Sequence, residues 1–525
     1  MRMVGVIMCV ALGAFVCFLL WKLFNTCYLK PLQTYHKLKS HGFSGPIPHF
    51  PLGNRSEMMN TSTQEEDDNG SSSCVGISHN IHPTCMPYFS RWQKAYGKVF
   101  VYWVGTEPFL YVADPEFLKQ MSAAAATRNW GKPLVFKGDR QTLFGQYGLN
   151  MIEAEGWVLH KRIISPAFST SYIKLIPNSM VECTKKLTGR WATLVASSNH
   201  MEIDVEYDIS SISAEIISKT GFGLGYEEGK LIYNKLRAMQ FVLFKNMYNR
   251  YIGVPFGQFL SPKETLEATR LGNEIDKLLQ SIISARRNVI GDNPQQDLLG
   301  LMLQGIRDDE HKLIKGMMDK EIIDECKAFF FAGYESGTLA ISWTLLFLSV
   351  DQKWQKELRE EIKEVVGDGE IDWTTLARLK KMDLVMSEVL RLYPSAPSGV
   401  RRAKGDIKIG ETIIPEGTNI WIDTLGMHHD RDLWGDDVHE FKPERFREDP
   451  LHGGCQHNMG YIPFGFGGRM CAGKNYATML YKIVLCTLLS RFSFSVSPAY
   501  RHSPVYFFTL RPSKGIRLIV KSLQG

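Results

Sequence analysis

One cysteine near the C-terminal end stands among residues that could support a charged sulfur atom. Cys471 follows a glycine-rich run in "YIPFGFGGRMCAGKNYATML", residues 461–480, and precedes a stretch with a helical pattern. Glycine reaches backbone angles that let N–H groups point at sulfur. A helix starting near Ala472 would direct its positive end at the same atom, and Arg469 and Lys474 add positive charge. These residues favour a site that holds a deprotonated sulfur.

Three interpretations of Cys471 follow from its neighbours. A lone cysteine beside a turn is most often a buried core residue. A catalytic nucleophile would need a histidine with an asparagine or aspartate partner close to the sulfur, and a linear sequence does not display one. A ligand to a metal-containing cofactor is the third interpretation, and the spacing of the residues around Cys471, described below, favours it.

A second stretch sets an acid beside an alcohol. The segment "ECKAFFFAGYESGTLAISWTLLFL", residues 325–348, is apolar nearly all round, as a core helix is. Glu335 and Ser336 interrupt it, and an acid and an alcohol together with water can relay protons. Ala332 and Gly333 are small, so they leave room beside the helix and allow a local distortion. The alternative is a polar pair that is satisfied within the core.

Composition excludes several other classes of function. The chain has 525 residues, 44% of them apolar, which is ample for a large core. A net charge of +6, without a basic stripe that has interleaved aromatic residues, argues against a nucleic-acid partner. The ten cysteines include no CxxC pair, which is typical of free thiols in a reducing compartment. The adjacent His428 and His429 cannot both face one metal ion from a regular helix or strand.

The N-terminal segment predicts a membrane anchor. Met3–Trp21 carries no charged side chain, and as a helix it would be about 28 Å long, close to the ~30 Å hydrocarbon core of a bilayer. A cleaved signal peptide would have a shorter apolar region and small residues at its end, whereas this one ends in the bulky "FLLWKLFNTC". We therefore predict an uncleaved anchor over residues 1–21. The basic residues that follow it predict a body that faces the cytosol; they are Lys22, Lys30, Lys37 and Lys39.

The remaining chain divides into a hinge and a body. We predict a basic and proline-rich hinge over residues 22–55 and a single catalytic domain over residues 56–525. Within the hinge, "HGFSGPIPHFPLGN", residues 41–54, has three prolines and three glycines and predicts a stiff, non-helical connector. The polar segment "NTSTQEEDDNGSSS", residues 60–73, predicts a loop because it can bury little apolar surface.

The periodicity of the body predicts a mainly α fold with small β-sheets, an α+β class. Residues 173–197 and 263–287 place apolar side chains at three- and four-residue steps. Strand signals are fewer. Residues 98–105 and 109–114 predict a hairpin, and residues 406–423 predict short strands between turns. The C-terminal "VYFFTLRPSKGIRLIVKS" predicts another hairpin.

The residues before Cys471 carry a resemblance to a known family. The pattern Phe464-x-x-Gly467-x-Arg469-x-Cys471-x-Gly473 resembles the heme-binding signature of the cytochrome P450 family. In that family a cysteine thiolate holds the iron of heme b (iron protoporphyrin IX) and donates electron density that favours O–O cleavage. The resemblance covers essentially the whole chain and implies that family's fold with one N-terminal transmembrane helix. "HPTCMPYFSRWQKAYGKVF" and "SMVECTKKL" look most like plant microsomal members of the seventy-two clan.

The same resemblance implies partners for the heme propionates. "GWVLHKRIISPAF", residues 156–168, resembles the family's tryptophan helix, in which Trp157, His160 and Lys161 would approach a propionate. The family commonly has arginine at the position of Lys161, and lysine keeps the charge without the bidentate geometry. Further propionate partners implied by the resemblance are Arg469 and Arg401.

A structural triad and a proton relay are also implied. By resemblance, Glu388 and Arg391 in "SEVLRLYP" would join Arg445 in "FKPERF" to form a buried triad that braces the heme-side loop. Glu335 and Ser336 would supply the protons needed to cleave dioxygen; most family members have threonine where Ser336 stands. The pocket above the heme would be lined by residues 128–150, 332–337 and 395–400.

The function that these features imply is that of a membrane-anchored heme-thiolate monooxygenase. It would lie in the endoplasmic reticulum membrane with its catalytic domain facing the cytosol, and take NADPH-derived electrons from NADPH-cytochrome reductase. Its substrate would be a lipophilic small molecule: a terpenoid or hormone-like isoprenoid, a fatty acid or a cytokinin. One alternative is a heme-thiolate hydroperoxide isomerase or dehydratase that needs no reductase, although the acid–alcohol pair disfavours it. Another is a heme sensor or carrier without catalytic activity.

Overall fold

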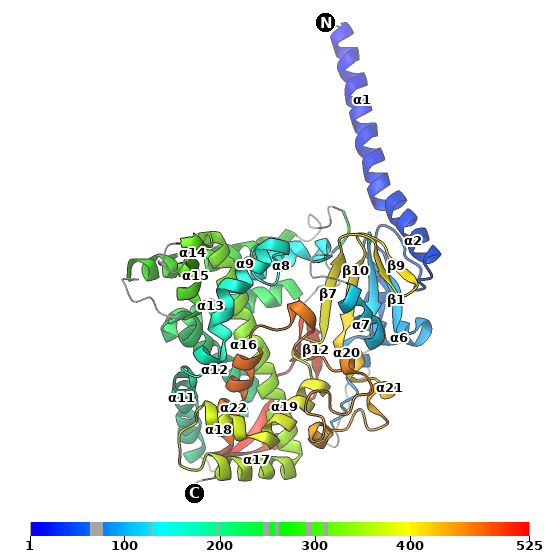
Figure 1. Ribbon diagram of the computed structural model, residues 1–525. Helices are drawn as coiled ribbons and strands as arrows, with labels where there is room; N and C mark the ends of the chain where they lie inside the picture. Colours follow the sequence, from blue (N-terminus) through cyan, green and yellow to red (C-terminus); the bar gives the residue numbers. More distant parts are fainter. Residues whose placement is uncertain are drawn as a thin grey trace.

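The computed structural model describes residues 2–63, 77–124, 129–197, 200–244, 251–255, 257, 262–289, 297–307 and 313–523. In Figure 1 a helix-rich part and a part built around a β-sheet lie side by side, and one long helix projects from the sheet side. The C-terminus lies at the opposite end of the molecule from the N-terminus. The class predicted from the sequence, mainly α with small sheets, is confirmed.

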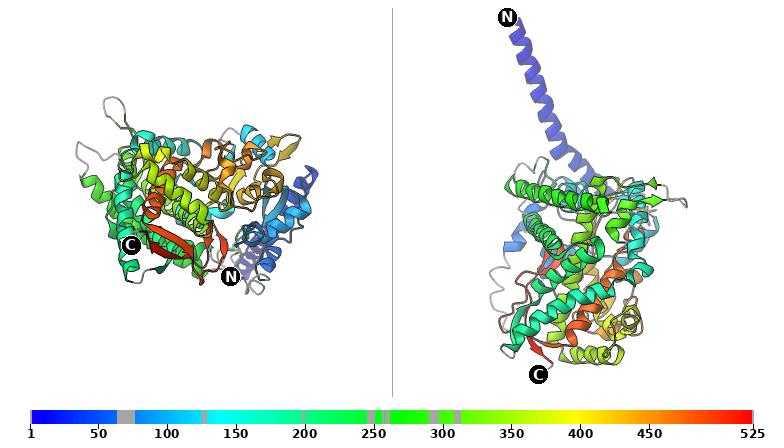
Figure 2. Two further views of the ribbon diagram at one scale, coloured as in Figure 1. Left: turned by 90° about the horizontal axis from the view of Figure 1, so that it is seen from below. Right: turned by 90° about the vertical axis from the view of Figure 1, so that its left-hand side faces the viewer.

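The projecting element is longer than the predicted anchor. Helix α1 (Arg2–Phe24) continues through a π-helical turn, Asn25–Leu29, into α2 (Lys30–Ser40). Since Pro31 has no N–H to donate, the wider turn before it, where the Lys30 N–H bonds to the Asn25 carbonyl, fits the helix around the proline. The right-hand view of Figure 2 also shows α1 clear of the body.

The first part of the predicted hinge is therefore helical. Within residues 22–55, the connector without helix begins only after Ser40. One described helix, over Ile7–Ser40, is long and apolar enough to cross a bilayer, and its most apolar window has no buried residue. The predicted polar loop at residues 60–73 overlaps the end of α3 (Arg55–Thr63), and its residues from 64 onward lie outside the described part of the chain.

The helix-rich part contains most of the helices, among them the longest ones of the body. They are α8 (Lys137–Phe144), α9 (Ala154–Ile164), α10 (Thr170–Ile173), α11 (Pro177–Ala196), α12 (Val205–Phe222), α13 (Tyr226–Phe244), α14 (Pro262–Val289), α15 (Leu298–Gln304), α16 (Asp319–Val350), α17 (Gln352–Val365), α18 (Trp373–Arg378), α19 (Lys380–Leu392) and α22 (Lys474–Leu489). Shorter helices accompany the sheet: α5 (His82–Cys85), α6 (Pro87–Tyr96), α7 (Pro115–Ala124), α20 (Thr424–His428) and α21 (Arg431–Trp434).

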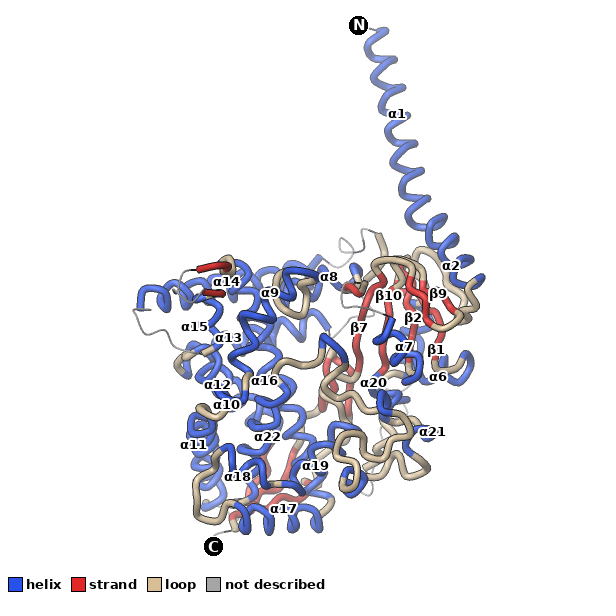
Figure 3. Tube along the Cα trace, in the orientation of Figure 1, coloured by secondary structure: helices blue, strands red, loops and turns tan. Residues whose placement is uncertain are grey.

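The largest sheet has five strands in the order β1-β2-β10-β7-β3, and Figure 3 shows its strands gathered on the side of the molecule that carries α1 and α2. Their bounds are β1 (Val99–Val104), β2 (Glu107–Val112), β10 (Asn419–Asp423), β7 (Ser398–Ala403) and β3 (Trp130–Gly131). β1 and β2 form the predicted antiparallel hairpin, whereas β2 and β10 pair in parallel. The predicted short strands near residue 410 are β8 (Ile407–Ile409), β9 (Thr412–Ile414) and β10.

The C-terminal segment does not form one hairpin, as the sequence suggested, but supplies two sheets. β12 (Pro504–Phe507) pairs with β13 (Thr509–Pro512), while β14 (Arg517–Ser522) lies between β11 (Phe492–Val496) and β4 (Met201–Asp204). The glycine at 515 suggested the turn of a hairpin, but it lies between β13 and β14, whereas the chain turns between β12 and β13 at Phe508, a residue with no turn preference. One further pair, β5 (Ile306–Arg307) with β6 (Leu313–Lys315), completes the described strands.

The central helix α16 runs through the middle of the helical part and packs against α12 and α22. A Cβ atom on Gly333 would lie 2.6 Å from the Ile217 side chain, and one on Gly337 would lie 2.8 Å from Leu480. These glycines thus permit close contact with neighbouring helices. The helix is uninterrupted at Gly333, where the sequence allowed a distortion.

Candidate active site

One stripe of the buried helix α16 keeps accessible surface. Phe329, Ala332, Gly333 and Ser336 are accessible or partly so, while the residues between them and after them are buried. Their spacing of three and four residues puts them on one face of the helix. Because this helix lies in the interior, that face lines an internal cavity. Ser395, in the predicted lining segment 395–400, donates a hydrogen bond from its hydroxyl to the Ser336 carbonyl at 3.0 Å.

Cys471 lies at the end of a turn that only glycine forms easily. Gly465 and Gly467 have φ angles of +74° and +63°, a region that penalises side chains. The turn closes where the Cys471 N–H donates to the Phe464 carbonyl at 2.9 Å. The Cys471 side chain is accessible, unlike a core cysteine, and α22 begins three residues later at Lys474. The sulfur is therefore available to a ligand.

The charges around Cys471 differ from the sequence-based expectation. Although Cys471 keeps accessible surface, the protein around it displaces enough water to raise the pKa of its thiol above the ordinary value, and the Gly473 N–H and the Lys474 ammonium offset this only in part. Arg469 does not contribute, because its guanidinium is turned toward the Leu149 and Ile152 carbonyls. The protein alone thus leaves the sulfur protonated. A bound cation would supply the missing stabilisation, since metal binding displaces a thiol proton.

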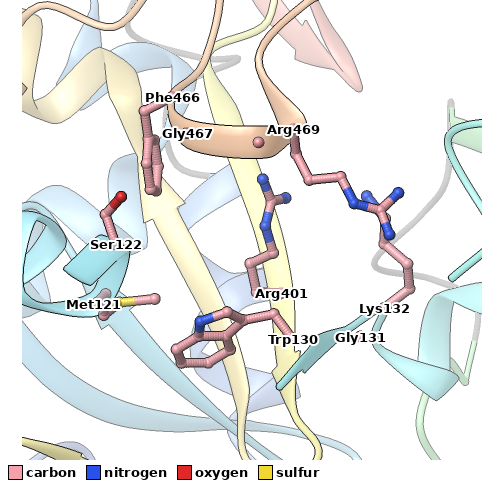
Figure 4. Close-up of a pocket in the computed structure, with 10 residues that line it drawn as sticks. Met121, Ser122, Trp130, Gly131, Lys132, Arg401, Phe466, Gly467 and Arg469 are labelled. Atoms are coloured by element: carbon pink, nitrogen blue, oxygen red, sulfur yellow. The ribbon is translucent and has the colours of Figure 1, made fainter. Parts of the chain in front are cut away.

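Three cations surround a pocket beside this turn. Figure 4 shows the guanidinium of Arg401 directed at the Gly467–Arg469 turn, with the ends of Arg469 and Lys132 next to each other. In the described part of the chain, none of these three has a carboxylate within ion-pair distance. Burial, followed by the charges of Arg401 and Arg469, holds the pKa of Lys132 well below its ordinary value. Burial and Arg401 lower the pKa of Arg469 to about 10.

Such a group of partly desolvated like charges is unfavourable unless an anion occupies its centre. The two propionates of heme b carry two negative charges and match this requirement. The residues present therefore fit the cofactor that the resemblance implies. Lys132 was missed in the sequence, where nothing distinguishes it from a surface lysine. Its place is fixed by the pairing of Gly131 with Arg402 and by a 2.7 Å hydrogen bond from its N–H to Glu153.

Trp157 and Lys161, which the resemblance places near a propionate, lie beside the same turn. Lys161 donates to the Gly468 carbonyl at 3.1 Å. The Trp157 ring lies between two cations, 4.2 Å from the Arg469 guanidinium and 4.8 Å from the Lys161 ammonium. Cation–π contacts of this kind hold the cations in place without neutralising them. α9 and the cysteine turn are thus joined at the pocket.

His160 points elsewhere, which corrects the expectation that it faces a propionate. Its Nδ1 lies 2.7 Å from a Glu325 carboxylate oxygen, and its Nε2 lies 3.5 Å from Glu321. Burial lowers the pKa of His160, but the hydrogen bond and charge of Glu325 outweigh burial and raise it. The reason is helical geometry: successive residues point about 100° apart, so His160 faces Glu325 on α16 while Lys161 faces the cysteine turn.

The structure brings Glu388, Arg391 and Arg445 together. Arg391 binds both Glu388 oxygens at 2.7 and 2.9 Å, and Arg445 lies 3.4 Å from the same carboxylate. Arg391 also donates to the His428 carbonyl at 3.0 Å, and the His428 ring accepts the Ile462 N–H at 3.1 Å. This chain of bonds links the triad to the segment that leads to Cys471. The Nε2 atom of His428 is therefore occupied by the hydrogen bond from the Ile462 backbone.

Glu335 and Ser336 face different surroundings although they are adjacent. Ser336 lies on the cavity face and donates its hydroxyl to the Ala332 carbonyl at 2.8 Å. Glu335 is 1% exposed and is held by Arg511 at 2.9 and 3.0 Å, by Thr509 at 2.7 Å and by Gln240 at 3.0 Å. The structure does not bring the acid and the alcohol into contact. Arg511, 176 residues away, could not be anticipated from the sequence.

Comparison with known proteins gives a consistent result. Residues 72–520 match the family model described as Cytochrome P450. A relative from Arabidopsis thaliana named Cytokinin hydroxylase is 35% identical over 520 residues, 97% of each chain. Cytochrome P450 714C2 of Oryza sativa subsp. japonica is 33% identical over 523 residues, covering 99% of this chain and 97% of the relative. Cytochrome P450 72A15 of Arabidopsis thaliana is 32% identical over 514 residues, 97% of each chain.

Proposed function

Since this chain belongs to the cytochrome P450 family, we propose that Cys471 is the residue that binds the iron of its heme b. Family membership makes the protein a monooxygenase and an oxidoreductase that binds heme b through a cysteine thiolate. When bound, the heme supplies the dioxygen chemistry, and the protein supplies its ligand, its orientation and its electrostatic surroundings. Cys471 combines an accessible sulfur, a glycine turn and the family's spacing.

The observation that carries the proposal is the set of three cations beside the Cys471 turn, for which the described residues provide no carboxylate within ion-pair distance. Lys132, Arg401 and Arg469 would hold the propionates. The Trp157 ring contacts the Arg469 guanidinium, and the Lys161 ammonium donates to the Gly468 carbonyl. These two side chains of α9 thereby hold Arg469 and the turn in place. The cations thereby fix the orientation of the heme as well as its affinity.

The Ser336 hydroxyl would be the group that donates a proton to water in the cavity. Its hydroxyl donates to the Ala332 carbonyl, and its accessible surface allows it to exchange that bond for one to water. A hydroxyl that both donates and accepts can pass a proton along a water chain. The role of Glu335, which the resemblance pairs with Ser336, is considered in the next section.

The substrate we propose is a lipophilic plant small molecule that is hydroxylated or epoxidised. Two relatives, 35% and 34% identical to this chain, are named Cytokinin hydroxylase. Aromatic side chains gather next to the cavity face of α16: Phe331 packs edge-on against Phe144 at 5.3 Å and lies 6.0 Å from Phe508. Such surfaces suit the flat or branched apolar groups of terpenoids, hormone-like isoprenoids, fatty acids and cytokinin side chains.

The electrons would come from NADPH through a membrane-bound reductase. Support for this lies in the groove of about 760 Å³ on the α19 and α22 side of the cysteine segment, which includes Met470 and Lys474. Support for an anchor in the endoplasmic reticulum membrane, with the body in the cytosol, comes from the apolar α1 and from the basic residues that follow it.

A carbon monoxide difference spectrum of the reduced protein tests the proposal. We expect the thiolate-type absorption band, and an imidazole-type band would contradict the ligand assignment. Type I spectral shifts with a panel of isoprenoids, fatty acids and adenine cytokinins would then identify the substrate class. Product formation that requires NADPH and reductase is expected. Turnover of a hydroperoxide without either would instead support the isomerase or dehydratase alternative.

A further inference from the structure

A chain of buried charges runs from the central helix toward the surface, and it is called the charge chain below. Arg511 on β13 binds Glu335 on α16 with one nitrogen and Glu206 on α12 with the other, the latter at 2.6 Å. Arg237 on α13 pairs with the far oxygen of Glu206 at 3.3 Å. Glu206 and Arg511 are 4% and 5% exposed. The four charges alternate, so each buried carboxylate has a cation.

Both oxygens of the Glu335 carboxylate accept hydrogen bonds from neighbouring side chains. Its Oε1 accepts from Arg511, Thr509 and Gln240, and its Oε2 accepts from Arg511. These contacts occupy both oxygens of the carboxylate and fix its direction. Ser336 projects about 100° away around the helix and faces the cavity. Glu335 is thus an acceptor directed away from the site where protons are needed.

Two of these donors belong to one strand of the C-terminal hairpin. Thr509 and Arg511 lie on β13, whose partner β12 is only four residues long. An isolated two-stranded hairpin is marginal in water and needs contacts with the rest of the protein. Besides the charge chain, the Leu510 backbone attaches β13 to Trp343 at 3.1 Å and to Ser395 at 3.3 Å. On β12, the Tyr506 hydroxyl lies 3.1 Å from the Ser398 hydroxyl, and the Cys85 thiol donates to the Pro504 carbonyl at 3.5 Å.

The tip of the hairpin is strained and lies against the cavity wall. Phe508 joins the two strands with a φ angle of +66°, where a non-glycine residue is unfavourable. Its ring packs 5.4 Å from Phe144 and 5.2 Å from Phe244, and 6.0 Å from Phe331, the residue before Ala332. Such a conformation persists only where surrounding contacts hold it.

We propose that Glu335 is a positioning residue, which with Arg511 fastens the β12–β13 hairpin over the cavity, and that Ser336 and water carry protons without it. This inference rests on the proposed monooxygenase function and reassigns one residue within it. It differs from the role that the resemblance implies for the acid. The distinction is measurable, because a lost proton donor and a loosened cavity wall change different quantities.

The first variant is Glu335→Gln, which is isosteric and leaves Arg511 paired with Glu206. Backbone amide hydrogen exchange over residues 504–512 is expected to become about tenfold faster, since local opening governs exchange. The KM for substrate should rise, while product formed per NADPH should stay within about twofold of the unmodified enzyme. A general acid contributes about 10²–10⁴-fold to rate, so a fall of about 100-fold in coupled turnover would overturn the proposal. Glu361→Gln, which alters a buried carboxylate on α17, should leave hairpin exchange unchanged.

The second comparison uses Arg511→Gln and the double variant with Glu335→Gln. Removing Arg511 alone leaves Glu335 buried without a cation, whereas Glu206 retains Arg237. Hairpin exchange should therefore be faster in Arg511→Gln than in Glu335→Gln. In the double variant it should be slower than in Arg511→Gln, because no unpaired carboxylate remains at position 335. Unchanged hairpin exchange in both Glu335→Gln and the double variant would contradict the inference. Hydrogen exchange reports on the hairpin and does not depend on catalysis. Unchanged exchange would therefore contradict the role of Glu335 alone, whereas the absence of a thiolate-type spectrum would contradict the proposed function.

Discussion

Arg391 donates two hydrogen bonds to the two oxygens of Glu388, at 2.7 and 2.9 Å, and neither side chain has exposed surface. The pair sits one helical turn apart on α19, but its other contacts reach well beyond that helix. Through His428 the guanidinium is connected to Ile462, nine residues before Cys471. The pair therefore acts on the position of the cysteine segment as well as on the stability of the fold.

Replacing Arg391 should unfold the enzyme at much lower denaturant concentration. Arg391→Leu would leave the buried Glu388 carboxylate with one cation, Arg445 at 3.4 Å, and with the Lys442 N–H at 2.9 Å, and breaking a buried ion pair costs about 3–5 kcal/mol. Urea denaturation measures the change in unfolding free energy. As a control, Lys356→Gln removes an exposed pair with Glu360 and should cost about 0–1 kcal/mol. Equal effects of the two changes would contradict the bracing role.

Cys471→Ala should abolish the thiolate-type carbon monoxide band of the reduced protein. The sulfur is the proposed ligand, and no neighbouring side chain of the turn offers a thiolate in its place. Cys455→Ala, which changes a half-buried cysteine ahead of the turn, should keep the band. Full monooxygenase turnover in Cys471→Ala would rule out the assignment.

Lys132→Gln should weaken heme retention. One charge-assisted hydrogen bond to a propionate is worth about 1.5–3 kcal/mol, so heme loss should be roughly 10–100-fold faster. Transfer of heme to an excess of apomyoglobin measures that rate. Lys119→Gln, an exposed lysine on α7, should lose heme at the rate of the unmodified protein. A rate in Lys132→Gln that equals the control would remove Lys132 from the site.

Ser336→Ala should raise hydrogen peroxide release relative to product. Without the hydroxyl, protons reach the cavity only through water, and the loss of a positioned proton-transfer group costs about 10²-fold or more in the step it serves. Ser336→Thr restores the hydroxyl and should return the ratio toward that of the unmodified enzyme. Peroxide and product are assayed in one reaction with reductase and NADPH. Unchanged coupling in Ser336→Ala would show that water alone suffices.

Three imidazoles, one buried and two partly buried, should make the fold sensitive to acid. Burial lowers the pKa of His79 and of His428 to about 3, and that of His502 to about 4. Since an unfolded histidine has a pKa near 6.5, the unfolded chain binds more protons below that pH, and stability falls as pH falls. Each group contributes about 1.4 kcal/mol per pH unit between about pH 6 and 4, or about 4 kcal/mol per unit for the three.

Urea midpoints measured from pH 7 to pH 4 check this dependence. His502→Gln removes one titrating group, so the slope of unfolding free energy against pH should fall by about 1.4 kcal/mol per pH unit. A slope that does not differ between the two proteins would show that His502 does not titrate on unfolding.

Features that depend on neighbours in the chain were predictable. The glycine turn before Cys471 follows from residues two to six positions away, and the pairing of Glu388 with Arg391 follows from their spacing on one helix. The long core helix around Glu335 was predicted from its apolar composition, although its ends lie further out. The β1–β2 hairpin was predicted from local alternation.

Features that depend on which elements pack together were not predictable. His160 faces Glu325 because α9 crosses α16, and the sequence gives no sign of that crossing. The C-terminal strands separate into two sheets because β14 finds β11 and β4 as partners.

The sequence by itself determined the cysteine turn, the core helix and the apolar N-terminal helix, since each is encoded by residues close together in the chain. Only the tertiary structure decided that Lys132 joins Arg401 and Arg469 and that Arg511 takes the carboxylate of Glu335 away from Ser336. The reason is that a charge acts through space over a few ångströms, and the residues within that distance are chosen by packing between distant segments.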